Sequence, residues 1–400
     1  MASRLLSSRA DPPDDALLSK MILTNCAACA ATLPHKGKQC SRCKTRYCGP
    51  ACQKQHWDAA GGHKDLCKLI KKGGGAEEYH ADKKYKEAVA VAAEKYADDT
   101  KGQTCFICTQ ALHWKTKEGL VRGCSCRGTA GVVHVSCLVE QAKILVAEGE
   151  ENNLDYEAMQ PRWDRWTQCS LCEQSYHSVV RCALGWACWK TSAGRPEMDP
   201  TRQLALCLLG KGLSAGGHYE DALVVQEAEL ATGRRVGTSE NANHMLIIKS
   251  NLAKTYSSLG RLEEALQLET DVYSRTLKLH GKEHARTLRA ASNYVSSLIE
   301  LKRFQQAKKL LRKSIPAARR VLGESKQITL HLRCNYAQSL CCNAAATLPE
   351  LREAVTTFED VGRIARRVLG GAHPFTTGVE ESRRKLRDVL AARETPPGSA

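Results

Sequence analysis

Aromatic side chains are scarce in this chain: four phenylalanines occur among 400 residues, and aromatic residues make up 5% of the total. We therefore expect no large aromatic core. Long apolar runs are also missing, whereas a membrane helix needs about 20 consecutive, predominantly apolar residues. The longest apolar candidate, residues 178–189, is short and contains Arg181. We expect no membrane-spanning segment.

An export signal is missing as well. In the first 20 residues the apolar runs are short, and Asp11, Asp14 and Asp15 break the pattern of a transit peptide. Without export, a secreted disulfide framework is the disfavoured explanation for the 20 cysteines. We expect a reducing compartment, the cytosol or the nucleus.

Signatures of common catalytic sites are also absent from the sequence. We find no Gly-rich phosphate loop, no nucleophile elbow and no paired acid–base motif. The formal net charge of +16 favours acidic proteins or nucleic acid as partners. The basic residues are spread through amphipathic segments, however, and form no compact cluster interleaved with aromatic residues. We therefore disfavour direct binding of nucleic acid and expect protein partners.

Cysteine, in contrast, is abundant and occurs at metal-ligand spacing. Between Cys26 and Cys172, fourteen cysteines and two histidines form two consecutive sets of eight. Zn²⁺ takes four thiolate or imidazole ligands, and a CxxC turn supplies two of them. Each set therefore suffices for two zinc ions, and we predict four zinc ions per chain.

The first set of candidate zinc ligands comprises Cys26, Cys29, Cys40, Cys43, Cys48, Cys52, His63 and Cys67. Its two CxxC pairs, YCxxxCQ segment and HKxxC segment make residues 21–70 resemble the MYND zinc finger. The resemblance implies interleaved sites, one of Cys26, Cys29, Cys48 and Cys52 and the other of Cys40, Cys43, His63 and Cys67. It also implies a groove for a partner peptide that is lined by Gln53 and Trp57. The alternative role for Trp57 is packing over the zinc loops.

This segment departs from the MYND pattern between Trp57 and His63, where five residues are inserted. The insertion leaves His56 as an alternative ligand, although His63 and the following Lys64 match the family. MYND fingers also occur beside methyltransferase domains of the SET family. The rest of this chain lacks the Asn-His and Gly-x-Gly patterns of that family, so we disfavour a methyltransferase.

The second set comprises Cys105, Cys108, Cys124, Cys126, His134, Cys137, Cys169 and Cys172. A CxC second pair, a Gly-rich loop and a VHxxCL segment make residues 101–180 resemble the RING-CH finger. The resemblance implies cross-braced sites, one of Cys105, Cys108, His134 and Cys137 and the other of Cys124, Cys126, Cys169 and Cys172. The plant-homeodomain finger shares this ligand order and remains the alternative fold.

The RING-CH resemblance implies a ubiquitin ligase, which would orient a charged ubiquitin-conjugating enzyme rather than react covalently. Its exposed apolar contacts would be Ile107 and Trp166, with Leu171 as a further candidate. Packing of the zinc loops is the alternative role for these side chains. Gln141 replaces a common Trp, and Glu173 stands where many RING proteins carry a basic residue. A non-enzymatic adaptor is therefore the alternative function.

The second half of the chain is repetitive. The recurring residues are Asn251, Asn293 and Asn335; Ala222, Ala265 and Ala307; and Gly281, Gly323 and Gly370. Their period resembles tetratricopeptide repeats of the kinesin-light-chain subtype and predicts stacked helix pairs. We expect the alanines to allow close packing and the glycines to end helices in a left-handed cap. We expect His284 and His373 to make turn contacts rather than bind zinc.

We therefore expect a multidomain chain: two small cross-braced zinc fingers followed by an all-α tetratricopeptide-like solenoid. The expected parts are a disordered N-terminus (1–20), the MYND finger (21–70), a helical linker (71–100), the RING-CH finger (101–180), a linker (181–200), the repeats (201–393) and a disordered tail (394–400). We expect the RING-CH finger to bind a ubiquitin-conjugating enzyme. The MYND groove and the concave face of the repeats would bind partner or substrate proteins.

Overall fold

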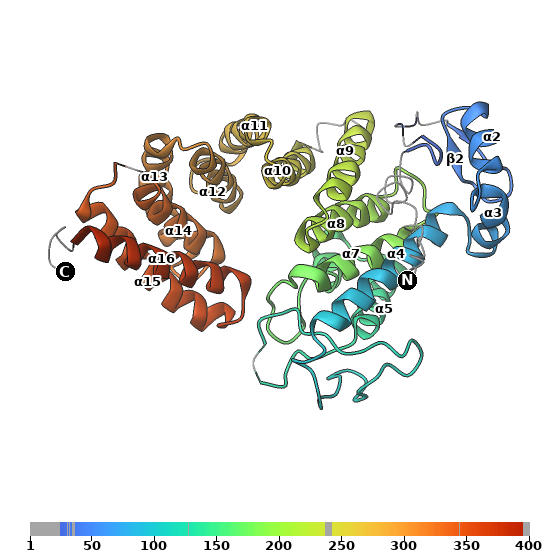
Figure 1. Cartoon of the computed structure of the whole chain (residues 1–400), viewed down its shortest axis with the longest axis horizontal. Helices are drawn as coiled ribbons and strands as arrows, with labels where there is room; N and C mark the ends of the chain where they lie inside the picture. Colours follow the sequence, from blue (N-terminus) through green and yellow to red (C-terminus); the bar gives the residue numbers. More distant parts are fainter. Residues whose placement is uncertain are drawn as a thin grey trace, which may run out of the picture.

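The computed structural model describes residues 25–29, 31, 33, 37–126, 128–236, 242–343 and 345–394. A cysteine-rich N-terminal part is followed by helices that pack one after another along an arc (Figure 1). This confirms the predicted architecture of zinc-finger modules and an all-helical repeat solenoid. Of the predicted disordered ends, residues 1–20 and 395–400 lie outside the described residues, and Glu394 ends the last helix. Within the described ranges, no helix is long and apolar enough to cross a membrane.

The first zinc module is a short hairpin followed by two helices. Its elements are β1 (Lys38–Gln39), β2 (Arg46–Tyr47), α2 (Pro50–Asp58) and α3 (His63–Lys72). The strands pair antiparallel, with Lys38 opposite Tyr47. Pro50 lies in the first turn of α2, where its missing N–H costs no hydrogen bond. Four of the eight buried apolar residues in its core are cysteines, so this module needs metal in place of a larger core.

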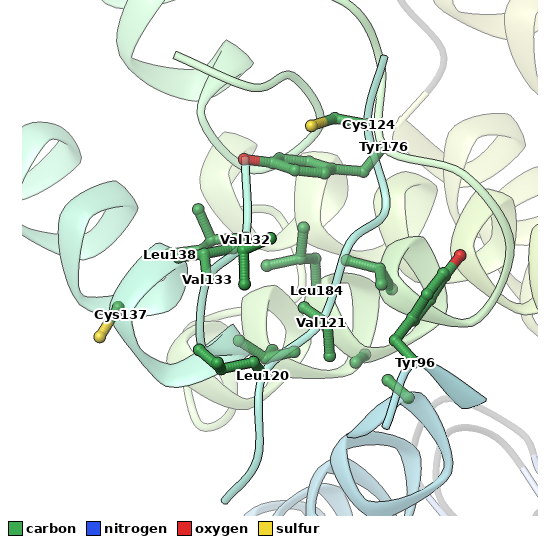
Figure 2. Close-up of a cluster of buried hydrophobic side chains, with 14 of the residues drawn as sticks. Tyr96, Leu120, Val121, Cys124, Val132, Val133, Cys137, Leu138, Tyr176 and Leu184 are labelled. Atoms are coloured by element: carbon green, nitrogen blue, oxygen red, sulfur yellow. The ribbon is translucent and has the colours of Figure 1, made fainter. Parts of the chain in front are cut away.

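The second zinc module contains little regular structure between residues 101 and 134. It continues into α5 (Val135–Glu151) and α6 (Tyr156–Asp164). Figure 2 shows its buried cluster, in which Val121, Val133 and Tyr176 from the loops pack with Leu184 from a later helix. The same cluster includes Tyr96, which follows the helix before the module. The module thus shares its core with the helices on either side.

Those flanking helices are α4 (Ala76–Lys95) and α7 (Ser178–Ser192). α4 packs along α7, and α7 packs along α8 (Pro200–Gly216). The second zinc module is therefore an insertion between two helices that pack on each other. The helix expected within 71–100 is present as α4, although it packs on α7, whereas residues 181–192 of the expected linker at 181–200 belong to a helix. The physical reason is that all residues from 182 to 189 are buried, so α7 is a core helix of the solenoid.

The solenoid continues as antiparallel helices, each packed on the next. They are α9 (Tyr219–Val236), α10 (Ala242–Ser258), α11 (Leu262–His280), α12 (Ala285–Glu300), α13 (Phe304–Leu322), α14 (Gln327–Cys341), α15 (Leu348–Leu369) and α16 (Pro374–Glu394). Ala222, Ala265 and Ala307 are completely buried, in agreement with their predicted role in close packing. The asparagine series connects neighbouring repeats. Asn293 donates a hydrogen bond to Ser250 Oγ (2.8 Å), and Asn335 donates one to Ser296 Oγ (3.1 Å).

The recurring glycines end α11, α13 and α15 with positive φ, but not in the expected left-handed helical conformation. Gly281, Gly323 and Gly370 have φ of 78°, 87° and 90° with ψ of 172°, 165° and 160°. This extended region with positive φ is accessible essentially to glycine alone. His284 and His373 follow in the same turns. Each accepts a hydrogen bond at Nδ1 from the backbone N–H two residues later, as expected for turn contacts.

The far end of the solenoid returns to the second zinc module. The rings of His177 and His373 meet edge to face with centroids 5.5 Å apart. A Cβ atom at Gly370 would lie 3.8 Å from the carbonyl oxygen of Ser125. The arc in Figure 1 therefore bends far enough for the α15–α16 turn to contact the zinc loops.

Candidate metal centres

The first module brings its eight candidate ligands together in two groups. One group is Cys26, Cys29, Cys48 and Cys52, and the other is Cys40, Cys43, His63 and Cys67. In each group all the ligand atoms lie within 4.8 Å of one another. Cys48 precedes α2 and Cys52 lies on it, one turn later, which places their sulfurs 3.3 Å apart. The second group is fully buried, with 3.9 Å between the sulfurs of Cys40 and Cys67.

The second module forms two further groups by the same criterion. They are Cys105, Cys108, His134 and Cys137, and Cys124, Cys126, Cys169 and Cys172. His134 Nδ1 lies 3.3 Å from Cys108 Sγ. Its Nε2 lies 3.4 Å from the carbonyl oxygen of Ala111, so an Nε2–H tautomer leaves Nδ1 free to bind a metal. All four groups contain the same residues that the two resemblances imply.

The distances in these groups suit zinc better than disulfides. A tetrahedral zinc with Zn–S bonds of about 2.3 Å places its sulfurs about 3.8 Å apart, whereas a disulfide needs about 2.05 Å. The Sγ atoms of Cys29 and Cys48, and those of Cys126 and Cys169, are 3.7 Å apart. None of the twenty cysteines is joined to another by a disulfide. The donor sets therefore fit Zn²⁺, which these side chains would hold as a structural ion.

Backbone amides support the thiolate form of two cysteines. The N–H of Ile107 points to Cys105 Sγ at 3.4 Å, and the N–H of Leu171 points to Cys169 Sγ at 3.4 Å. Hydrogen bonds to a charged acceptor are stronger than those to a neutral one, so both contacts favour a thiolate. The two CxxC turns thus share one local geometry.

His56, the alternative ligand, belongs to none of the four groups. Its Nδ1 lies 3.1 Å from the Tyr47 hydroxyl, and burial lowers the pKa of its ring. Gln53 and Trp57, the predicted peptide contacts, lie one turn apart on α2. Gln53 is half-buried, and 36% of Trp57 is exposed with its ring 5.6 Å from that of His63. Trp57 therefore covers the zinc loops and still presents a surface to solvent.

The predicted docking residues of the second module divide into two kinds. Ile107 and Leu171 are 38% and 53% exposed, whereas Trp166 is only 3% exposed. Trp166 packs in one buried cluster with Val146 and Trp186, because α5 and α7 enclose it. This burial contradicts the expected exposed role of Trp166 in docking and supports the packing alternative.

Sequence reasoning missed other exposed apolar residues of the second module. Leu112 and Trp114 are 58% and 68% exposed in the loop between Cys108 and Cys124. Because both lie in a loop between two candidate zinc ligands, the sequence could have indicated that they are exposed. Sequence reasoning also missed Arg181, which lines a cavity between this module and the solenoid.

Comparisons with known proteins agree with parts of this description. The family model for the MYND finger matches residues 26–67, and that for the tetratricopeptide repeat matches residues 241–320. Neither of these two models covers the second zinc module. A search of curated proteins finds no match.

Among solved structures, TPR-like repeats assigned to a kinesin light chain of Podosopora anserina match with 19% identity and a TM-score of 0.36. That match covers 58% of this chain and 97% of the other. BtubC (BKLC) from P. vanneervenii matches with 13% identity and a TM-score of 0.38, over 55% of this chain and 94% of the other. From the family models and its own helix pairs, this chain carries a MYND-type zinc finger and tetratricopeptide-like repeats.

Proposed function

We propose that this protein is a zinc-dependent protein-interaction scaffold that holds four zinc ions in its two zinc modules. The observation that carries the proposal is the convergence of sixteen Cys and His side chains into four groups of four. Zinc would close loops that have too little apolar core to fold alone. The closed loops then present Gln53 and Trp57 on α2, while the solenoid presents a curved face to partner proteins.

Metal analysis tests the zinc count directly. We expect four zinc ions per chain in protein purified under reducing conditions, with no disulfide in the intact mass. A chelator that removes the zinc should abolish the fold of the first module, because its core consists largely of ligand cysteines. Clearly fewer than four ions per chain, or cysteines joined to one another, would contradict the proposal.

A second candidate function is transfer of ubiquitin. The observation in its favour is the exposure of Ile107 and Leu171, each inside a CxxC turn whose backbone donates to a ligand sulfur. Such turns are rigid, and a rigid apolar tip can hold a conjugating enzyme in one orientation. The burial of Trp166 leaves this candidate with fewer docking contacts than the sequence predicts.

Ile107→Ala tests the ligase. If the protein is a ligase, we expect at least a tenfold loss of self-ubiquitination across a panel of conjugating enzymes, with zinc content unchanged. Ile144→Ala is the matched control, since Ile144 is 49% exposed on α5, outside the zinc loops. Full activity of Ile107→Ala would remove the proposed docking face. No transfer with any conjugating enzyme would favour the non-enzymatic adaptor.

A further inference from the structure

The second zinc module carries an exposed loop tip that neither metal binding nor the shared core explains. The loop tip is residues 112–117, between the candidate ligands Cys108 and Cys124. Its apolar residues Leu112 and Trp114 are 58% and 68% exposed, and Trp114 is the most exposed large apolar side chain in the described part of the chain. The loops of this module form one outer edge of the molecule (Figure 1). A large, flat partner can therefore reach the loop tip.

Hydrogen bonds hold the loop tip in one shape. The N–H of Lys117 donates to the carbonyl oxygen of His113 (2.9 Å), and the N–H of His113 donates to the carbonyl oxygen of Glu118 (3.1 Å). The carboxylate of Glu118 accepts hydrogen bonds from the backbone N–H and the hydroxyl of Ser136, both at 2.7 Å, and from the hydroxyl of Thr116 at 3.0 Å. Glu118 therefore ties the base of the loop tip to α5, and the two apolar side chains stay exposed on a fixed support.

The uncompensated charge at the loop tip is positive. Lys115 and Lys117 are exposed, and within the described ranges neither has an ionic partner. Beside Trp114 lies a cavity of about 890 Å³ between the loop tip, α4 and α5, and each acidic residue that lines it has a partner. These pairs are Asp82 with Lys86 and Lys190, Glu140 with Lys143, and Glu118 with Ser136. No unpaired carboxylate of this cavity therefore opposes an anionic partner.

A projecting Trp and Leu beside two lysines suit an anionic lipid bilayer better than a protein. Trp favours the membrane interface, where its ring is among apolar groups and its N–H stays hydrated. Lysines are attracted to the negative headgroups of the same surface. A stable protein interface needs about 800 Å² from each partner and a complementary shape, which two projecting side chains do not supply. A bilayer accepts such side chains by insertion and needs no preformed pocket.

We propose that the loop tip binds the surface of a membrane that contains anionic lipids. Leu112 and Trp114 would insert near the headgroups, and Lys115 and Lys117 would contact the negative groups of the lipids. The loop joins a ligand of one metal group to a ligand of the other group in this module, so bound zinc would fix both of its ends. Little conformational entropy is then lost on binding. This interaction goes beyond the proposed function, because it adds a lipid surface on which the scaffold would act.

Co-sedimentation of the full chain with phosphatidylcholine vesicles, with and without phosphatidylserine, tests the proposal. We expect binding that requires phosphatidylserine and that weakens at least about tenfold when Leu112→Ser is combined with Trp114→Ser, because less apolar area is buried. The matched control is Leu279→Ser with Val389→Ser, since these residues are 54% and 45% exposed on α11 and α16. It should stay within about twofold. Equal weakening by both pairs, or no binding by the unaltered protein, would overturn the proposal.

Lys115→Gln combined with Lys117→Gln tests the charge, with zinc content and helical circular dichroism as checks of folding in every variant. We expect at least about tenfold weaker binding, since each lysine near an anionic surface contributes about fivefold. Lys309→Gln with Lys313→Gln, on the exposed face of α13, is the control for net charge, and equal weakening by it would overturn the site.

Sedimentation of the protein without lipid tests the competing occupant of the loop tip, a second copy of the chain. Dimers that Trp114→Ser dissociates, together with no binding to vesicles, would assign the loop tip to self-association and overturn the membrane proposal. We expect a species whose mass does not depend on Trp114. If four zinc ions are present while no vesicle binds, this inference fails and the proposed function stands.

Discussion

Replacing Cys169 with serine is expected to release a zinc ion and to unfold the second zinc module together with its contacts to α7. Cys169 is completely buried, and its sulfur lies 3.7 Å from that of Cys126. Its cluster also contains Val180 of α7. Leu184 of the same helix belongs to this cluster as well (Figure 2). Binding of a structural zinc contributes on the order of 10 kcal/mol, which is comparable to the whole stability of a domain. Serine supplies no thiolate, so this contribution is lost.

The measurement is zinc per chain by elemental analysis, combined with thermal unfolding and limited proteolysis. We expect at most three zinc ions and new cleavage sites between residues 101 and 176. Cys342→Ser is the matched control, because Cys342 is exposed and belongs to none of the four ligand groups. Four retained zinc ions in Cys169→Ser would show that Cys169 is not needed to hold a zinc ion.

Local spacing was enough to predict which side chains would meet. Cys48 lies just before a helix and Cys52 lies on its first turn, four residues later, and CxxC turns bring two sulfurs together by themselves. The repeat period likewise predicted the helix pairs, because Ala222, Ala265 and Ala307 mark one packing position. These patterns lie within a few residues or recur at fixed intervals, so a single sequence displays them.

Contacts between segments far apart in the sequence produce no such local or periodic pattern, so the sequence did not predict them. α4 and α7 are separated by the whole second zinc module, and α7 is buried on all sides. A helix without a polar face has no apolar stripe that periodicity can detect, so residues 181–200 resembled a linker. Trp166 was misjudged for a related reason: its exposure depends on α5 and α7, which the zinc-ligand pattern does not describe.

The packing of α7 on α8 leads to the second large effect, which concerns Gly212. A Cβ atom at Gly212 would lie 2.8 Å from the carbonyl oxygen of Arg181 and 3.3 Å from the Cα of Cys182. Gly185 faces the same contact from α7, where its Cβ would meet the carbonyl oxygen of Leu208 at 3.1 Å. The two helices therefore approach each other through their backbones. A side chain here cannot be relieved by rotating a neighbour and must push the helices apart.

Gly212→Leu is expected to lower the free energy of unfolding by about 3 kcal/mol, as overpacking of a close contact does. The midpoint of thermal unfolding should fall by roughly 6–12 °C. Gly378→Leu on α16 is the matched control, since a Cβ there has no neighbour within 4 Å and leucine favours a helix over glycine by about 0.8 kcal/mol. The control should melt at the same temperature or slightly higher. If both variants melted alike, the close α7–α8 contact would be refuted, and with it the seating of the second zinc module on the solenoid.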